Sequence, residues 1–170
     1  MDYELSKEQS MQANEDAKLR MRKFIEDLTD GYKKTLEGEP GPENMHLLTG
    51  EQHALLSYRI LSDEIMEGGF CQLIQNGYGP YIFDNPFAKA MRLFGAKSLS
   101  KLLYKAKEIY DANREDLERE RTDDEFMAMY EQYEAFDDLE EEFFLMEEAT
   151  TIEIAEYVEA NFSLFGKEPV

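Results

Sequence analysis

EIMEGGFCQLIQNGYGPY, residues 64–81, is the stretch that decides how this chain folds. Gly68 and Gly69 interrupt a helix-forming run, and because they lack a Cβ they can adopt positive φ and let two segments approach closely. Phe70 and Ile74 follow four residues apart, on one face of a second helical stretch. The stretch matches neither GxxxxGK[ST] nor GxGxxG, which argues against a phosphate-binding loop. We therefore predict a tight corner between two helices, with Phe70 as its buried aromatic ring.

Helical periodicity extends to both sides of this corner. Apolar residues recur every three or four positions through most of the chain, and no alternating pattern is long enough to build a sheet. The sequence predicts an all-α protein, a compact helical bundle of about seven to eight helices around the Gly-Gly-Phe corner.

Several short motifs predict where helices begin. Thr49 is a candidate N-cap residue for one helix. Residues 122–125 (TDDE) and 150–153 (TTIE) both match the capping box. In this motif a threonine hydroxyl and a glutamate side chain each bond the other residue's backbone N–H. Residues 84–86 (DNP) place a capping side chain before a proline at the first helical position. We therefore expect a short helix or turn over residues 136–148 and a separate helix from the second capping box onward.

A run rich in proline and glycine divides the chain. Residues 1–38 form an amphipathic N-terminal helix, residues 39–46 a linker, residues 47–166 the main helical domain and residues 167–170 a tail. Behind such a linker, the first helix either packs onto its own domain or serves an oligomer interface. Both uses remain open from the sequence.

The charge is strongly acidic and unevenly distributed. The chain carries 38 Asp and Glu against 18 Lys and Arg, a formal net charge of −20 with a pI near 4.4. Residues 111–159 hold 20 of these acids and only three bases. Such a surface repels nucleic acids and anionic membranes, and it attracts basic proteins. With Cys71 as the single cysteine and no apolar leader at the start, the expectation is a soluble cytoplasmic protein.

A search for catalytic groups finds little. His46 and His53 are the only histidines, and they form no HExxH motif. Glu64 and Glu67 lie three residues apart and could contribute to a carboxylate metal site, but the repeated Glu-x-x-His pattern of di-iron bundles is missing. Cys71 beside Phe70 is typical of a core thiol. We therefore expect no enzyme activity, no metal and no cofactor, and we keep a carboxylate metalloenzyme as a third hypothesis.

Four segments together resemble the bacterial DNA-mimic domain family, otherwise a family of unknown function. They are LTGEQ (48–52), GGFCQLIQN (68–76), RLFGA (92–96) and YVEANF (157–162), and the resemblance covers residues 45–165. It implies an all-helical domain, often dimeric, without known catalysis. It also implies that carboxylates occupy the DNA-binding surface of another protein, as some relatives do.

The leading hypothesis is an acidic module that binds a basic protein, and in its sharper form a DNA mimic that displaces nucleic acid from a DNA-binding protein. Neither direct nucleic-acid nor membrane contact is expected, and a homodimer remains open. The alternative is a structural or immunity-type scaffold that binds through an apolar helix surface. The residues expected to contact the partner are the carboxylates of the second half: Asp123, Asp124, Glu131, Glu134, Asp137, Asp138, Glu140, Glu141, Glu142, Glu147 and Glu148.

Overall fold

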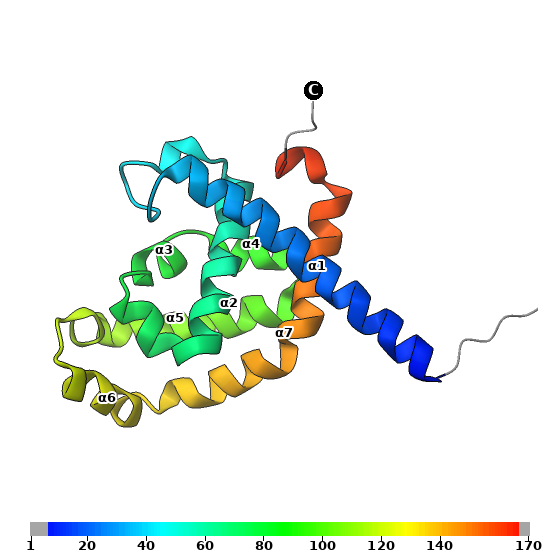
Figure 1. The fold of residues 1–170 in the computed structure, drawn as a ribbon. Helices are drawn as coiled ribbons and strands as arrows, with labels where there is room; N and C mark the ends of the chain where they lie inside the picture. Colours follow the sequence, from blue (N-terminus) through cyan, green and yellow to red (C-terminus); the bar gives the residue numbers. More distant parts are fainter. Residues whose placement is uncertain (1–6, 167–170) are drawn as a thin grey trace, which may run out of the picture.

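A computed structural model describes the backbone of residues 7–166 and the side chains of residues 14–166 (Figure 1). The chain opens with the long helix α1 (Lys7–Leu36), which ends where Glu37 adopts a positive φ of 55°. The segment predicted as a linker continues as a turn and enters a 3₁₀ helix, η1 (Met45–Leu47). The predicted tail, residues 167–170, and the first six residues lie outside the described part.

Helix α2 (Gly50–Gln75) runs through the centre of the molecule and contains the glycine corner (Figure 1). Thr49 caps it, as predicted, through a complete capping box with Gln52. Gly69 breaks the helix with φ 78° and ψ −170°, a conformation that is essentially restricted to glycine. The corner is therefore a break at Gly69 inside one helical run, between the two helical stretches that the sequence predicted.

The Phe70 ring is fully buried at this break. Its centroid lies 5.1 Å from that of Phe136, in a stacked arrangement, and 6.3 Å from that of Phe83. Such aromatic contacts add to the free energy gained by burial. Phe70 thus packs the last part of α2 against Phe83 and Phe136, and its burial confirms the aromatic ring predicted at the corner.

Three helices follow α2 and cover one side of it. They are α3 (Gly79–Phe83), α4 (Phe87–Leu93) and α5 (Lys97–Glu118). The α4 and α5 helices pack on each other, and Gly95, with φ 93°, provides the turn between them. The Ser100 hydroxyl donates to the carbonyl of Ala88 at 2.6 Å and ties the two helices together.

The predicted cap before α4 is wrong. Pro86 itself occupies the N-cap position, and no side chain caps the helix there. The Asn85 amide instead donates to the carbonyl of Tyr81, and the Asp84 carboxylate pairs with Arg114 of α5 at 2.7 Å. Both polar groups find partners on neighbouring elements, so neither is available to cap α4.

The acidic half folds into α6 (Asp123–Gln132), α7 (Ala135–Ala160) and a final 3₁₀ helix, η2 (Phe162–Leu164). The capping box at Thr122 is confirmed, with its hydroxyl and the Glu125 carboxylate exchanging bonds with the opposite backbone. In Figure 1, α7 runs along the lower edge and then turns upward where α1 crosses it.

The second predicted capping box does not begin a helix, because Thr150 and Thr151 are buried in the middle of α7. The Thr151 hydroxyl lies 2.7 Å from the Tyr58 hydroxyl, so it links α7 to α2. The expectation of two separate helices over residues 136–162 is therefore wrong, and one helix spans most of that range. The sequence motif matched, but tertiary packing gave its threonines another use.

The first and last helical segments also meet. The Tyr32 hydroxyl of α1 donates to the carbonyl of Phe165, just after η2. Phe165 is buried against Phe94 and Tyr157, with ring centroids 5.5 and 6.1 Å away. Residues 7–166 thus contain seven α-helices and no strand, which confirms the all-α prediction. None of these helices has an apolar stretch long enough to cross a lipid bilayer.

Candidate protein-binding surface

The acidic segment is fastened to the glycine corner by two hydrogen bonds. The break at Gly69 diverts the backbone of α2, and the neighbouring polar groups then bond outside that helix. The Gly68 carbonyl accepts a bond from the Tyr130 hydroxyl of α6 at 2.9 Å, and the Phe70 N–H donates to the Glu140 carboxylate of α7 at 2.8 Å. The corner therefore fixes the position of both acidic helices.

Ion pairs hold the start of α6 against the end of α5. Arg119 lies between two carboxylates, 3.0 Å from Asp116 and 2.8 Å from Glu125. The hydrogen bond from Arg119 lowers the pKa of Glu125 to about 2, and the capping bonds add to this effect. A bond from the Tyr133 hydroxyl, together with Arg119, lowers the pKa of Asp116. These carboxylates are therefore neutralised within the protein.

Arg121 carries a second cation beneath the acidic surface. Its side chain is fully buried, and its Nη2 donates to the Asp116 carbonyl and lies 3.0 Å from an oxygen of the Asp116 carboxylate. The positive charge of Arg121, one of the three bases counted in residues 111–159, thus lies inside the protein. It offsets the surrounding carboxylates without reaching solvent.

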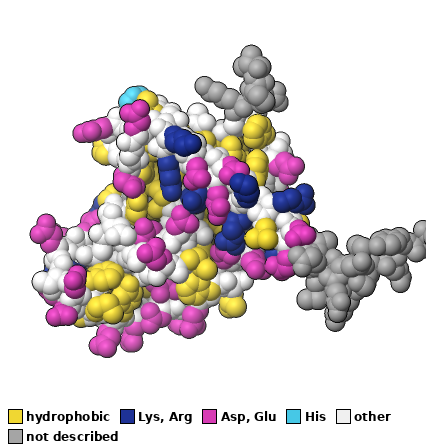
Figure 2. All heavy atoms as spheres, viewed as in Figure 1, with side chains coloured by type: hydrophobic (Ala, Val, Ile, Leu, Met, Phe, Trp, Pro, Cys, Tyr) yellow, Lys and Arg dark blue, Asp and Glu magenta, His cyan; other side chains and the backbone are white. Residues whose placement is uncertain are grey.

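Eight of the eleven predicted carboxylates are exposed and form no ion pair or hydrogen bond through their side chains with any described residue. They lie on α6, on the short connection after it and on the first half of α7. We call this set the outward carboxylates: Asp123, Asp124, Glu131, Glu134, Asp137, Asp138, Glu141 and Glu142. In Figure 2, acidic side chains dominate this lower part of the molecule, whereas Lys and Arg gather along α1.

The other three predicted residues are occupied within the protein. Glu140 is half-buried and accepts the bond from Phe70 N–H described above, and burial raises its pKa, with a smaller contribution from Asp137. Glu147 is buried, with only 7% of its side chain exposed, and its carboxylate lies 2.7 Å from the Arg22 guanidinium. The structure therefore removes Glu140 and Glu147 from the set available to a partner.

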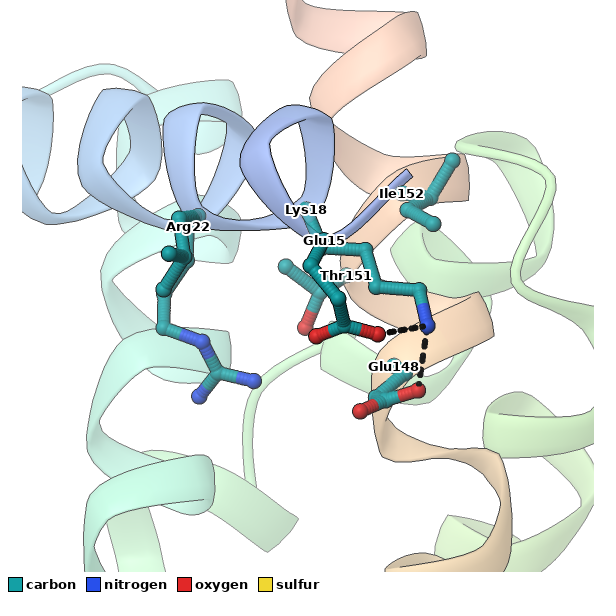
Figure 3. A pocket seen from close by; sticks show the side chains of 7 residues that line it. Glu15, Lys18, Arg22, Glu148, Thr151 and Ile152 are labelled. Atoms are coloured by element: carbon teal, nitrogen blue, oxygen red, sulfur yellow. Dashed lines mark hydrogen bonds and ion pairs between the residues drawn. The ribbon is translucent and has the colours of Figure 1, made fainter. Parts of the chain in front are cut away.

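Glu148 is exposed but already paired with α1. Figure 3 shows the Lys18 ammonium between two carboxylates, those of Glu148 and Glu15, at 3.0 and 3.3 Å. Together with the Arg22–Glu147 pair, this contact places two cations of α1 on the second half of α7. The first helix packs onto its own domain here, one of the two uses left open by the sequence.

The remaining polar candidates do not form a catalytic group. Both ring nitrogens of His53 are bonded, Nδ1 to the Tyr81 hydroxyl at 2.8 Å and Nε2 to the Met45 carbonyl at 2.7 Å. Burial raises the pKa of the Cys71 thiol to about 12, so it is unreactive at neutral pH. Glu64 accepts bonds from two side-chain amides. Among residues 14–166, no cluster of three or more His, Cys, Asp or Glu could hold a metal ion.

Comparison with known proteins identifies the family. The model of the DMP19-like protein family matches residues 46–161. The chain belongs to the DMP19-like family. It is 30% identical over 129 residues to the DNA mimic protein DMP19 of Neisseria meningitidis serogroup B (strain ATCC BAA-335 / MC58), an alignment that covers 75% of this chain and 78% of that protein. Membership confirms the resemblance drawn from the four sequence segments and favours the non-enzymatic hypothesis.

The matched DMP19-like region contains the glycine corner and the outward carboxylates, but it excludes α1. Two of the features missed by sequence reasoning involve partners distant in the chain. Glu140 is 70 residues from Phe70, and Glu147 is 125 residues from Arg22. The only signal available was their spacing of seven, which places both on the inward face of α7 beside Phe136 and Phe143.

Proposed function

We propose that this protein is a DNA mimic, a non-enzymatic module whose carboxylates occupy the nucleic-acid-binding surface of a basic protein. The observation that carries the proposal is the set of outward carboxylates without internal cations. An acid that only stabilises the fold is expected to lie near a cation or a backbone N–H, as Glu125 and Glu140 do. Carboxylates left without such partners are free to pair with the Lys and Arg of another protein.

The charge spacing supports this function. Asp137, Asp138, Glu141 and Glu142 supply four charges along about 7.5 Å of helix axis, given a rise of about 1.5 Å per residue. That corresponds to about one charge per 2 Å, against about one per 1.7 Å of duplex DNA. Competition for the same Lys and Arg groups therefore needs no catalytic residue. The name of the Neisseria relative, a DNA mimic protein, agrees with this mechanism.

The test compares two variants of equal net charge. One replaces Asp137, Asp138, Glu141 and Glu142 with lysine. The control also introduces four lysines, at exposed acids that lie outside α7 and form no ion pair with described residues: Glu43, Glu67, Glu108 and Glu115. Each protein is immobilised and exposed to lysate of the source cell at about 50 mM salt, because such binding weakens steeply towards about 200 mM.

We expect the wild-type protein and the control to retain a basic protein that duplex DNA then elutes at constant ionic strength. The α7 variant should retain none of it, while the helical circular dichroism of all three stays the same. Retention by the α7 variant, or a partner that binds DNA and this protein at once, would refute mimicry. The scaffold hypothesis would then be favoured, since binding through an apolar surface is insensitive to salt.

A further inference from the structure

Apolar side chains lie on the outward face of α7, between carboxylates. Leu145 is the most exposed large hydrophobic residue among residues 14–166, with 89% of its surface accessible. Ala149 and Ile152 follow at i+4 and i+7, on the same helix face, and they are exposed and half-buried respectively. Single exposed apolar residues are ordinary on protein surfaces, but a row at helical spacing marks an interaction site.

Helix α1 extends this row. Leu19 of α1 is 63% exposed and lines the same small hollow as Ile152, next to the Lys18–Glu148 contact in Figure 3. We call Leu19, Leu145, Ala149 and Ile152 the apolar seam. In Figure 2, hydrophobic side chains lie among both acidic and basic ones where α1 crosses α7.

Carboxylates flank the seam along α7, whereas Lys18 and Arg22 line the hollow at its α1 end, where each is already paired with a carboxylate of α7. Glu141 and Glu142 precede Leu145 by four and three residues, and Glu156 follows Ile152 by four. All three are exposed, and their side chains form no ion pair with described residues. A phosphate backbone has no apolar row of this kind, so phosphate mimicry alone leaves the seam unexplained.

We propose that the seam binds a basic amphipathic helix of the partner protein. The apolar face of that helix would cover Leu145 and Ile152, and its flanking Lys and Arg would pair with Glu141, Glu142 and Glu156. An amphipathic helix recognises such a surface through apolar residues at i, i+3, i+4 and i+7. The inference rests on the proposed function for the source of the cations, but it adds a contact that salt does not weaken.

Charge argues for a different protein rather than a second copy of this chain. Each copy carries a formal net charge of −20. Two copies meeting at the seam would bring the flanking carboxylates of α7 together, and like charges in contact oppose association. A basic helix would instead bring opposite charges to Glu141, Glu142 and Glu156.

The probe is a labelled peptide of about 18 residues with leucines on one helix face and lysines beside them. A control peptide has the same composition, but its leucines are distributed around the helix. Both are titrated into the full-length protein by fluorescence anisotropy at about 50 and 200 mM salt. Variants Leu145→Ser and Leu93→Ser are compared, because Leu93 is 67% exposed on α4, away from the seam.

We expect the amphipathic peptide to bind more tightly than its control, and Leu145→Ser to weaken it by about tenfold without changing the salt dependence. Leu93→Ser should bind like the wild type. Equal binding of both peptides, or no effect of Leu145→Ser, would overturn the seam. A wild-type dimer in sedimentation that Leu145→Ser converts to monomer would assign the seam to a second copy instead.

The two proposals fail separately. If Leu145→Ser weakens binding of the peptide while duplex DNA elutes no partner retained from the lysate, the seam stands and mimicry fails. If duplex DNA elutes the partner while Leu145→Ser leaves binding of the peptide unchanged, mimicry stands and the seam fails.

Discussion

The inward and outward faces of α7 carry the same residue type in opposite roles. On the inward face, Glu140 receives the N–H of the glycine corner and Glu147 receives Arg22 of α1. On the outward face, Glu141 and Glu142 have no partner among the described residues. The difference shows that acidic composition alone does not define a binding surface. Helical phase divides the carboxylates into those that hold the fold together and those left for another molecule.

The largest expected difference between interior and surface concerns aromatic rings. Phe70 is fully buried at the corner, whereas Phe144 on α7 is 48% exposed. Phe70→Ala should lower the free energy of unfolding by about 3–5 kcal/mol, because it removes a packed ring and leaves a cavity. Phe144→Ala should cost less than about 1 kcal/mol. Urea unfolding measures both, and equal losses would contradict the contrast between the buried ring of the corner and the exposed ring on the outward side of α7.

The next largest effect on stability is expected at Gly69, beside the Phe70 N–H that donates to Glu140. A Cβ on Gly69 would lie 2.2 Å from a Glu140 carboxylate oxygen, and its φ of +78° disfavours any other residue. Gly69→Ala should therefore lower the free energy of unfolding by about 1–3 kcal/mol. At Gly68 an added Cβ would lie 2.0 Å from the Gln72 side-chain amide oxygen and 2.9 Å from its Cβ, so Gln72 must shift, but φ at Gly68 is not positive and is open to alanine. A thermal melt that ranks Gly68→Ala as the more damaging change would contradict this account.

A comparable loss is expected when the buried carboxylate loses its cation. Arg22→Ala leaves Glu147 buried without its ion pair, and this should cost about 1–3 kcal/mol. Its neighbour Lys23 pairs with Asp27 on the open surface of α1, where both side chains are largely exposed. Lys23→Ala should stay within about 0.5 kcal/mol. Chemical denaturation of the two variants decides whether Glu147 belongs to the interior.

The smallest effect is a pH dependence. Burial raises the pKa of Glu140 above its ordinary value of 4.5, so the folded protein binds this proton more tightly than the unfolded chain. Stability through Glu140 should therefore rise as the pH falls from neutral towards the raised pKa of this carboxyl. Below that range Glu125, with a pKa of about 2, binds protons more readily in the unfolded chain, and its contribution is lost.

The variant Glu140→Gln isolates this effect, since its amide oxygen still accepts the Phe70 N–H. We expect its melting temperature to rise less on mild acidification than that of Glu141→Gln, which keeps the inward carboxylate. Identical pH profiles of the two variants would show that Glu140 does not titrate differently in the folded state.

The features predicted from the sequence are the local ones. The caps at Thr49 and Thr122 depend on residues three positions away, and both are formed. The glycine corner and the buried Phe70 likewise follow from residues within one stretch. Fold class follows from the same short-range periodicity.

What the sequence could not show depends on partners far along the chain. Thr151 matched a capping box, yet its hydroxyl meets Tyr58, 93 residues away. Glu147 matched the acidic surface, yet Arg22 lies 125 residues from it. Within an isolated helix, a charged or hydroxyl side chain has a similar free energy whichever face it lies on. Its role is therefore decided only when distant helices pack against that face.

These contacts between residues far apart in the chain also affect how the protein folds during synthesis. During synthesis, residues 50–75 leave the ribosome before the carboxylate that accepts the Phe70 N–H, because Glu140 lies 70 residues further along the chain. The Tyr32 hydroxyl of the first helix meets its acceptor only once Phe165 has been made, 133 residues later. The corner and the first helix therefore cannot form these two contacts in a shorter chain. We expect both regions to be incompletely packed during synthesis and to become ordered when the later residues emerge.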